Sequence, residues 1–424
     1  MSLRPAPSAL AARIRRAVAR HESAIRDFTA ALVAIPTENP PGNRYRDCAR
    51  LLASKLKSLG LPAEVIRVPA PAAPRDRPGE RRERNEPRFC VLSSLGRGKR
   101  TLYFHGHYDV VPAQSPRQFR PVVKNGVLAG RGSADMKCGL AAMIYAMAVL
   151  KELRTPLAGK IGLVLVPDEE TGGAGGSRYL LESDRLGRDG IAMFTPEPTS
   201  ELIWNACRGA TSMRVTVRGK PAHVGLHFRG VNAFEHAMEI AREFESLKRR
   251  VARRRTRFAI APATARRSVL LIGGEMSGGT NFNAVPAECC FTIDRRINPE
   301  ESLDSETRSL LRIIARARRR GIHVSAEIFQ HEPAAGFSAD EPVAQALAHS
   351  AREITGRAPR FEMCPGLLEI RFYAARGVPA YAFGPGKLEV AHGPHESVVL
   401  KKVCEFTSIY ALAAARILSA RSAR

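Results

Sequence analysis

Three consecutive carboxylates end one apolar stretch of the sequence, which reads IGLVLVPDEETGG over residues 161–173. Its isoleucine, leucine and valine residues are typical of a strand that is buried on both faces. At the end of such a strand, Asp168, Glu169 and Glu170 repel one another unless cations or protons offset their charge. The stretch therefore predicts a site that binds a metal ion or transfers a proton.

Three other segments place potential metal ligands close to the ends of predicted strands. FHGHYDVVP carries His107 and Asp109, GRGSADMKCG carries Asp135, and TPEPTS carries Glu197. Taken alone, Asp135 fits a helix cap and Glu197 fits an ordinary loop residue. Because the carboxyl ends of strands in an open α/β sheet meet at one edge, we expect all these side chains to converge there.

Two histidines near the end of the sequence extend this possible ligand set. The segment VAHGPHESV contains His392 and His395. Two histidines and three carboxylates could hold two zinc ions, with one carboxylate bridging the ions and one position open to water. A cation would then offset the charge of one adjacent glutamate, while the other glutamate takes a proton from the water.

The elements that must position these residues alternate between strands and helices over the first half of the chain. This alternation predicts an α/β fold, with a mainly parallel sheet and helices on both of its faces. From Arg208 onward the pattern changes, because GATSMRVTVRGK alternates like a strand with one face in solvent. We therefore expect an inserted α+β domain at residues 208–331, between two parts of a catalytic domain at residues 1–207 and 332–424.

The motifs from IPTENPPGN to AHGPHESV resemble, in order, those of a family of zinc-dependent amidohydrolases and peptidases. That family includes acetylornithine deacetylase, succinyl-diaminopimelate desuccinylase, aminoacylase and carboxypeptidase G. The resemblance implies a cofactor of two Zn²⁺ ions, for which Co²⁺ can substitute. It also implies that His107, Asp135 and Glu197 hold one ion, and that Asp135 bridges to a second ion held by Glu170 and His392.

The same resemblance implies roles for residues outside the ligand set. Glu169 would be the general base, and Asp109 would orient His107. The inserted domain would be a lid and a homodimerisation domain. Within it, His223 of GKPAHVGLHFRGVNA would polarise the scissile carbonyl or stabilise the oxyanion.

Four residues match positions where the family contacts its substrate, namely Asn283, Arg296, Gly366 and Arg371. Arg296 could form a bidentate pair with a substrate carboxylate. The segment GLLEIRF, residues 366–372, departs from the family pattern between its glycine and its arginine. This departure affects the substrate end of the site and leaves the predicted metal ligands unchanged.

These observations predict a hydrolase that removes an acyl group, of the acetyl or succinyl type, from an N-acyl amino acid. The alternative is a dipeptidase or carboxypeptidase with the same metal site, since both kinds of substrate present an amide next to a carboxylate. A remote alternative is a nucleic-acid-binding or scaffold protein, which the net charge of +25 suggests. The arginine-rich runs contain no interleaved aromatic residues, so we do not expect nucleic acid as a partner.

Composition also sets expectations about the surroundings of the protein. Its eight cysteines form no C-x-x-C pair, which is typical of free thiols in the cytoplasm. No apolar run reaches the roughly 18 residues that a membrane span needs, so we expect no membrane partner. The proline- and charge-rich residues 69–88 predict a solvent loop or a disordered insertion.

Overall fold

The computed structural model describes residues 8–69 and 87–419 of the chain. Almost all of the predicted loop 69–88 therefore lies outside the described residues. The chain divides into two compact units, of which the first comprises Met1–Asn205, Phe337–Phe361 and Phe372–Arg424. The second comprises Ala206–Gly336 and Glu362–Arg371. The segment that carries Gly366 and Arg371 thus belongs to the second unit.

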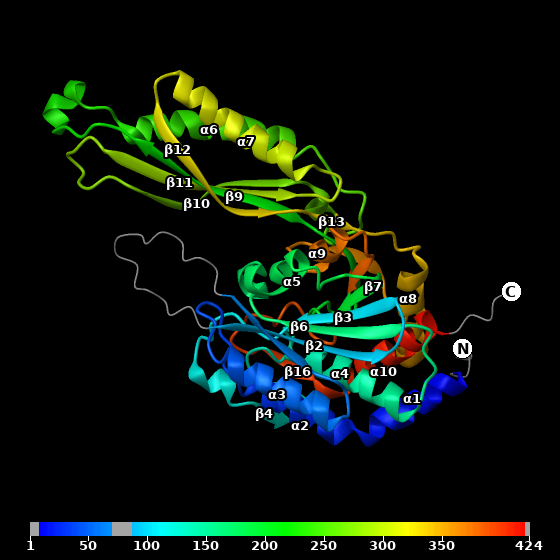
Figure 1. The fold of residues 1–424 in the computed structure, drawn as a ribbon. Helices are drawn as coiled ribbons and strands as arrows, with labels where there is room; N and C mark the ends of the chain where they lie inside the picture. Colours follow the sequence, from blue (N-terminus) through cyan, green and yellow to red (C-terminus); the bar gives the residue numbers. More distant parts are fainter. Residues whose placement is uncertain (1–7, 70–86, 420–424) are drawn as a thin grey trace. The chain divides into compact units, whose positions relative to one another are not determined.

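A sheet forms the centre of the first unit (Figure 1). Its strands are Glu64–Val68 (β1), Arg88–Gly96 (β2), Thr101–His107 (β3), Lys160–Val166 (β6), Gly190–Thr195 (β7), Ile203–Cys207 (β8) and Ala380–Ala382 (β15). In space they follow the order β1-β2-β6-β3-β7-β15-β8. Because β6, β3, β7 and β15 are parallel neighbours, the carboxyl ends of these strands lie at one edge of the sheet.

Helices cover both faces of this sheet (Figure 1). On one face, Phe104 of β3 contacts Tyr410, and on the other face His105 of β3 contacts Tyr373. The helices of the first face are Ala9–Arg20 (α1), Glu22–Val33 (α2), Tyr45–Ser58 (α3), Lys137–Glu152 (α4), Pro342–Thr355 (α8) and Leu400–Ile417 (α10). The opposite face carries Tyr179–Glu182 (α5) and the part of Ile370–Ala374 (α9) from Phe372 onward, which belongs to the first unit. The prediction of an α/β fold with a mainly parallel sheet is confirmed.

Helix α4 packs more closely against the sheet than a helix with ordinary side chains could. It is buried from Lys137 to Leu150 and is apolar on all sides, as expected of a helix in a core. A Cβ atom on Gly139 would lie 2.2 Å from the side chain of Pro196, and one on Gly106 would lie 2.5 Å from Leu140. These glycines bring the start of α4 against the ends of β3 and β7, where the predicted ligands lie.

A small sheet joins two segments of the first unit that are far apart in the sequence. It consists of Val122–Lys124 (β4), Val127–Ala129 (β5) and Ser397–Val399 (β16), in the order β16-β5-β4. In the antiparallel pair of β16 and β5, Ser397 lies opposite Ala129. The residues just before β16 therefore meet the residues just after β5.

The second unit is an antiparallel sheet with two helices on one face (Figure 1). The strands follow the order β10-β11-β9-β12, with the bounds Gly209–Arg218 (β9), Val269–Gly278 (β10), Glu288–Ile297 (β11) and His323–Glu332 (β12). Helices Ala233–Val251 (α6) and Leu303–Arg319 (α7) bury their apolar faces in a core with these strands. Two further short strands are Ala335–Gly336 (β13), which pairs with the end of β8, and Phe361–Cys364 (β14). Among the described residues, no helix is both long and apolar enough to span a membrane.

Candidate metal centre

Two groups of potential metal ligands lie at the carboxyl edge of the first unit's sheet, and they share one residue. His107, Asp135 and Glu197 form one group, and Asp135, Glu170 and His392 form the other. Within each group, the ligand atoms all lie within 4.8 Å of one another. The structure therefore brings together the five residues for which the sequence predicts metal binding.

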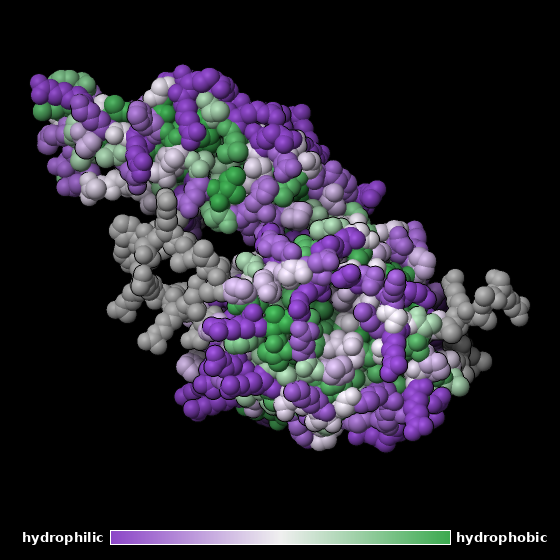
Figure 2. Space-filling model, viewed as in Figure 1, coloured by the Kyte–Doolittle hydropathy of each residue, from purple (hydrophilic) through white to green (hydrophobic). Residues whose placement is uncertain are grey.

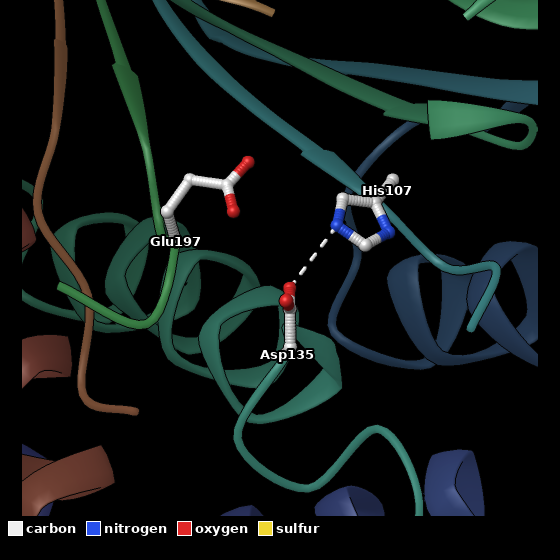
Figure 3. A group of neighbouring side chains, drawn as sticks. All are labelled: His107, Asp135 and Glu197. Atoms are coloured by element: carbon white, nitrogen blue, oxygen red, sulfur yellow. Dashed lines mark ion pairs between the residues drawn. The ribbon is translucent and has the colours of Figure 1, made fainter. Parts of the chain in front are cut away.

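His107 is held at the end of β3 with one ring nitrogen directed toward Asp135 (Figure 3). Its Nε2 lies 3.3 Å from Oδ1 of Asp135. The other nitrogen, Nδ1, lies 3.1 Å from the backbone oxygen of Asp109 and 3.4 Å from its carboxylate. A proton on Nδ1 would satisfy these oxygens and leave Nε2 free to bind a metal ion.

The carboxylate of Asp109 also holds the backbone of the two adjacent glutamates. It is fully buried and accepts hydrogen bonds from the backbone N–H groups of Glu169, at 3.2 Å, and Glu170, at 3.1 Å. The side-chain amide of Asn39 donates a third hydrogen bond to it, at 2.8 Å. One carboxylate thus fixes both the ring of His107 and the turn that carries Glu169 and Glu170.

The remaining acid of the run, Asp168, takes part in the structure of the loop. Its backbone is in the left-handed conformation, with φ of 78°, and its side chain is buried. Arg88 lies 2.9 Å from Oδ1, and the backbone N–H of Gly175 donates to Oδ2 at 2.8 Å. The guanidinium of Arg88 therefore offsets the first of the three adjacent charges.

His392 contributes to the second group from a loop near the end of the chain. Its Nε2 lies 3.2 Å from Oδ2 of Asp135 and 3.2 Å from Oε1 of Glu170. The imidazole is 49% exposed, whereas His107 and Asp135 are buried. The second group is thus more accessible to solvent than the first.

The electrostatics of the cluster show that it requires positive charge. Asp135 and Glu170 raise the pKa of His392 to about 10. Burial alone would raise the pKa of Asp135, but His107 and His392 lower it well below its usual value. Burial raises the pKa of Glu170 despite its ion pair with His392.

The donor set also fits divalent metal ions. Oδ1 of Asp135 and Oε1 of Glu170 are buried and accept no regular hydrogen bond from the described residues. Histidine nitrogens and carboxylate oxygens in groups of three are typical ligands of zinc in hydrolytic sites. Metal ions at these two positions would offset the buried negative charge with the histidines in their neutral form.

The other predicted site residues lie in the second unit. His223 is exposed, and its Nδ1 accepts a hydrogen bond from the backbone N–H of Gly225 at 3.1 Å. Asn283 lies beside it, since its backbone oxygen accepts from the N–H of Val224. These two predicted residues are therefore neighbours within one unit.

The predicted substrate-binding arginines both have carboxylate partners. Arg296 lies 2.9 Å from Asp294, and its side chain is 32% exposed. Arg371 is buried and lies 3.0 Å from Glu332. Gly366, on the same segment as Arg371, accepts a hydrogen bond from the N–H of Arg208.

Several residues that support the cluster were not singled out by the sequence analysis. Asn39 lies in a segment that reads only as a turn, and Arg88 lies 80 positions before its partner Asp168. Arg131 and Glu396 form a buried ion pair at 2.6 Å. The sequence signal for Asn39, Arg131 and Glu396 was their place inside the motifs TENPPGN, GRGSADMKCG and AHGPHESV, whereas Arg88 lies at the end of the stretch 69–88 and carries no such signal.

Comparison with known proteins places these motifs in a family. The model of peptidase family M20/M25/M40 matches residues 103–416. A succinyl-diaminopimelate desuccinylase of Gluconacetobacter diazotrophicus is 27% identical over 341 residues, which cover 77% of this chain and 84% of the relative.

Solved structures show the same fold at lower sequence identity. Aminopeptidase PepT from Bacillus cereus is 21% identical, with a TM-score of 0.71, 93% of this chain covered and 99% of that chain covered. The YXEP protein of Bacillus subtilis, a dinuclear metal-binding peptidase, is 16% identical, with a TM-score of 0.68 and coverage of 95% and 99%. The chain belongs to peptidase family M20/M25/M40, whose members are metal-dependent hydrolases of amide bonds.

Proposed function

We propose that this protein removes an acyl group, of the acetyl or succinyl type, from an N-acyl amino acid. The observation that carries this proposal is the pair of ligand groups that share Asp135 at the carboxyl edge of the sheet. Similarity to a succinyl-diaminopimelate desuccinylase over most of both chains supports an acyl amino acid as the substrate.

The proposed cofactor is a pair of zinc ions, for which cobalt can substitute. His107 and Glu197 would hold one ion, Glu170 and His392 would hold the other, and Asp135 would bridge them. When bound, such ions polarise a carbonyl oxygen and lower the pKa of bound water toward neutrality. Asp109 would keep His107 and the backbone of Glu170 in position to bind.

Glu169 is the proposed general base. It follows Asp168 in the turn held by Asp109, and it is half-buried beside the ligand Glu170. Its carboxylate would take a proton from the attacking water and deliver it to the nitrogen of the leaving amine. Since proton transfer needs a carboxylate of fixed position, the hydrogen bond from the Glu169 backbone to Asp109 supports this role.

His223 is the proposed donor to the oxyanion. Because its Nδ1 accepts a hydrogen bond from Gly225, the neutral ring carries its proton on Nε2. That N–H group could donate to the oxygen on which negative charge develops. Among the proposed substrate contacts in the second unit, Arg296 has a partly exposed guanidinium that pairs with Asp294 and would also have to pair with a substrate carboxylate. Asn283 adjoins His223, and Arg371 supports the segment that contains Gly366.

A change of Glu169 to glutamine tests the proposed mechanism. We expect Glu169→Gln to lower kcat by about 10²-fold or more, since an amide cannot accept the proton. Zinc content should remain near two ions per chain, because Glu169 is not a proposed ligand. Retained turnover would contradict the role of general base, and loss of one zinc ion would make Glu169 a ligand instead.

A dipeptidase or carboxypeptidase is the second candidate. The family and the fold of aminopeptidase PepT favour it, since the same metal site can cleave a peptide bond next to a free carboxylate. N-acetyl and N-succinyl amino acids should be assayed beside dipeptides with the same zinc-loaded enzyme. A higher kcat/KM for the acyl amino acids would support the deacylase, and a higher value for the dipeptides would replace it with the peptidase.

We further propose that the protein acts in the cytoplasm as a homodimer. All eight cysteines are free thiols, which supports a reducing compartment. The second unit carries exposed apolar side chains that support its role in dimerisation.

A further inference from the structure

A buried ion pair joins the two loops that supply Asp135 and His392. Arg131 follows β5, Glu396 precedes β16, and each residue is 1% exposed. We infer that this pair, the Arg131–Glu396 clasp, positions the ligands of the second metal ion. This inference rests on the proposed dinuclear centre. It assigns to the clasp the role of holding two ligands of that centre, Asp135 and His392, in position relative to each other.

Glu396 binds the loop of Asp135 through its backbone. Oε1 accepts hydrogen bonds from the N–H groups of Ala134, at 2.9 Å, and Asp135, at 3.0 Å. Oε2 accepts from Nη1 of Arg131 at 2.6 Å. Both carboxylate oxygens are thus occupied, and one of them fixes the peptide that leads into the bridging ligand.

Arg131 binds the loop of His392 in the same manner. Its Nη2 donates to the backbone oxygen of His392 at 3.0 Å, and its Nη1 reaches the oxygen of Gly393 at 3.4 Å. His392 has a φ of 62°, a left-handed conformation that residues other than glycine seldom adopt unless their neighbours hold them. The guanidinium is therefore a direct restraint on the backbone that directs the imidazole.

The small sheet explains why residues 265 positions apart can meet. β16 pairs with β5 so that Ser397 lies opposite Ala129, and the N–H of Gly130 donates to the oxygen of Glu396 at 3.0 Å. The Arg131–Glu396 clasp lies directly beside this backbone pairing and joins the same two segments through side chains. Any change in the pairing of β5 and β16 would thus move Asp135 relative to His392.

The two metal positions depend on the clasp to different extents. The first group draws His107 from β3 and Glu197 from the segment after β7, and only Asp135 touches the clasp. In the second group, both Asp135 and His392 are held by it, and only Glu170 is independent. Breaking the clasp should therefore weaken the second metal position and spare the first.

Zinc binding by Glu396→Gln and Arg131→Met tests this asymmetry. Glutamine keeps the shape of Glu396 and an oxygen for the two backbone N–H groups, but it removes the charge that Arg131 pairs with. We expect the second zinc ion to bind about 10–100-fold more weakly in both variants, with little change for the first. The readouts are zinc content at buffered free zinc and the absorption spectrum of the cobalt-loaded protein.

Two further variants separate positioning from general destabilisation. Arg295→Met removes a buried arginine of the second unit that lies 2.7 Å from Glu301 and 3.0 Å from Glu306, and it should retain two zinc ions. The double variant Arg131→Met/Glu396→Gln leaves no buried charge unpaired, so it should regain stability relative to the single variants. If the clasp positions the ligands, the double variant still binds its second zinc ion weakly.

The outcomes distinguish the clasp from the proposed centre. Loss of the second zinc ion alone, in the single and double variants, supports the clasp. Wild-type affinity for both ions in the single variants, or recovery of the second ion in the double variant, overturns it. A wild-type protein that binds fewer than two zinc ions would overturn the dinuclear centre itself, and with it the role of the clasp.

Discussion

At the scale of single residues, the site depends on buried polar side chains that hold its acidic residues in place. Asn39 is the clearest example, because its amide donates to Asp109 at 2.8 Å, to Asp168 at 3.3 Å and to the hydroxyl of Thr171 at 2.9 Å. It therefore connects the carboxylate that orients His107 to both sides of the turn that carries Glu169 and Glu170. A side chain that touches no proposed reacting group can thus determine the geometry of several.

We expect Asn39→Ala to reduce kcat more than it changes KM, because Asp109 loses a donor and the turn of Glu169 and Glu170 becomes less restrained. Leaving buried acceptors without this donor should also lower the free energy of unfolding by about 1–3 kcal/mol. Steady-state kinetics and urea unfolding measure the two effects. The matched control is Asn43→Ala, in the same turn, where a backbone N–H bonds to Glu38. Equal losses of activity in the two variants would contradict a specific role for Asn39.

Also at the residue scale, the raised pKa of His392 predicts how stability without metal depends on pH. In the metal-free protein, protonated His392 stabilises the fold fully below its unfolded pKa of about 6.5, and this contribution is lost as pH rises through about 10. Bound metal ions take the place of the proton and need the neutral ring. The difference in Tm between zinc-loaded and chelator-treated protein should therefore grow from about pH 6 to about pH 10. A difference that stays constant or shrinks over this range would contradict the ligand role of His392.

At the scale of elements, the sequence predicted the strands whose ends carry the site because their apolar runs are unambiguous. β3 and β6 are almost entirely buried. His107 ends β3 and Glu170 follows β6, so the position of each next to an apolar run indicated that it belongs to the site. β5 and β16 span three residues each and carry no comparable pattern. Their pairing depends on tertiary structure, so the meeting of Arg131 and Glu396 could not be read from the sequence.

The turn after β6 shows that the roles of adjacent charged residues also depend on tertiary structure. Its three acids indicated a cation site, and the family resemblance assigned roles to Glu169 and Glu170, but the sequence did not show which groups hold Asp168. Asp168 differs from its neighbours only through Arg88, Asn39 and Gly175, which surround it in the fold. A left-handed backbone at Asp168 directs its side chain into these partners and leaves Glu169 and Glu170 to the site.

At the scale of the whole molecule, part of the arginine excess stabilises the second unit. Arg316 and Arg320 at the end of α7 both pair with Glu243 of α6, at 2.6 and 2.8 Å. Just after the C-terminal end of α6, Arg254 pairs with Glu301 and Glu306, which lie around the start of α7. Hydrophilic side chains cover much of the visible surface of both units, with apolar groups among them on each (Figure 2).

Exposed apolar side chains of the second unit predict where a second copy of the chain binds. A cavity of about 870 Å³ in the second unit is lined by Phe234, Met238, Met276 and Phe282, among others. Phe282 is 97% exposed and Met276 is 77% exposed, and the neighbouring strand β10 is an edge of its sheet. Monomers seldom expose such a patch beside an open strand edge, whereas a two-fold dimer would cover both.

We therefore expect the protein to sediment as a dimer at micromolar concentration. Phe282→Asp and Met276→Asp should shift it toward the monomer, because each would bury a carboxylate in an apolar interface without a partner. Val122→Asp is the matched control, since Val122 is 58% exposed on the first unit and should leave the dimer unchanged. A monomeric wild-type protein, or dimers of equal strength in all three variants, would contradict dimerisation through this surface. Dimerisation through the second unit would restrain the strand that precedes Asn283. The monomeric variants should therefore also lose activity. Addition of a catalytically inactive Glu169→Gln chain with an intact surface should not restore the activity of these variants.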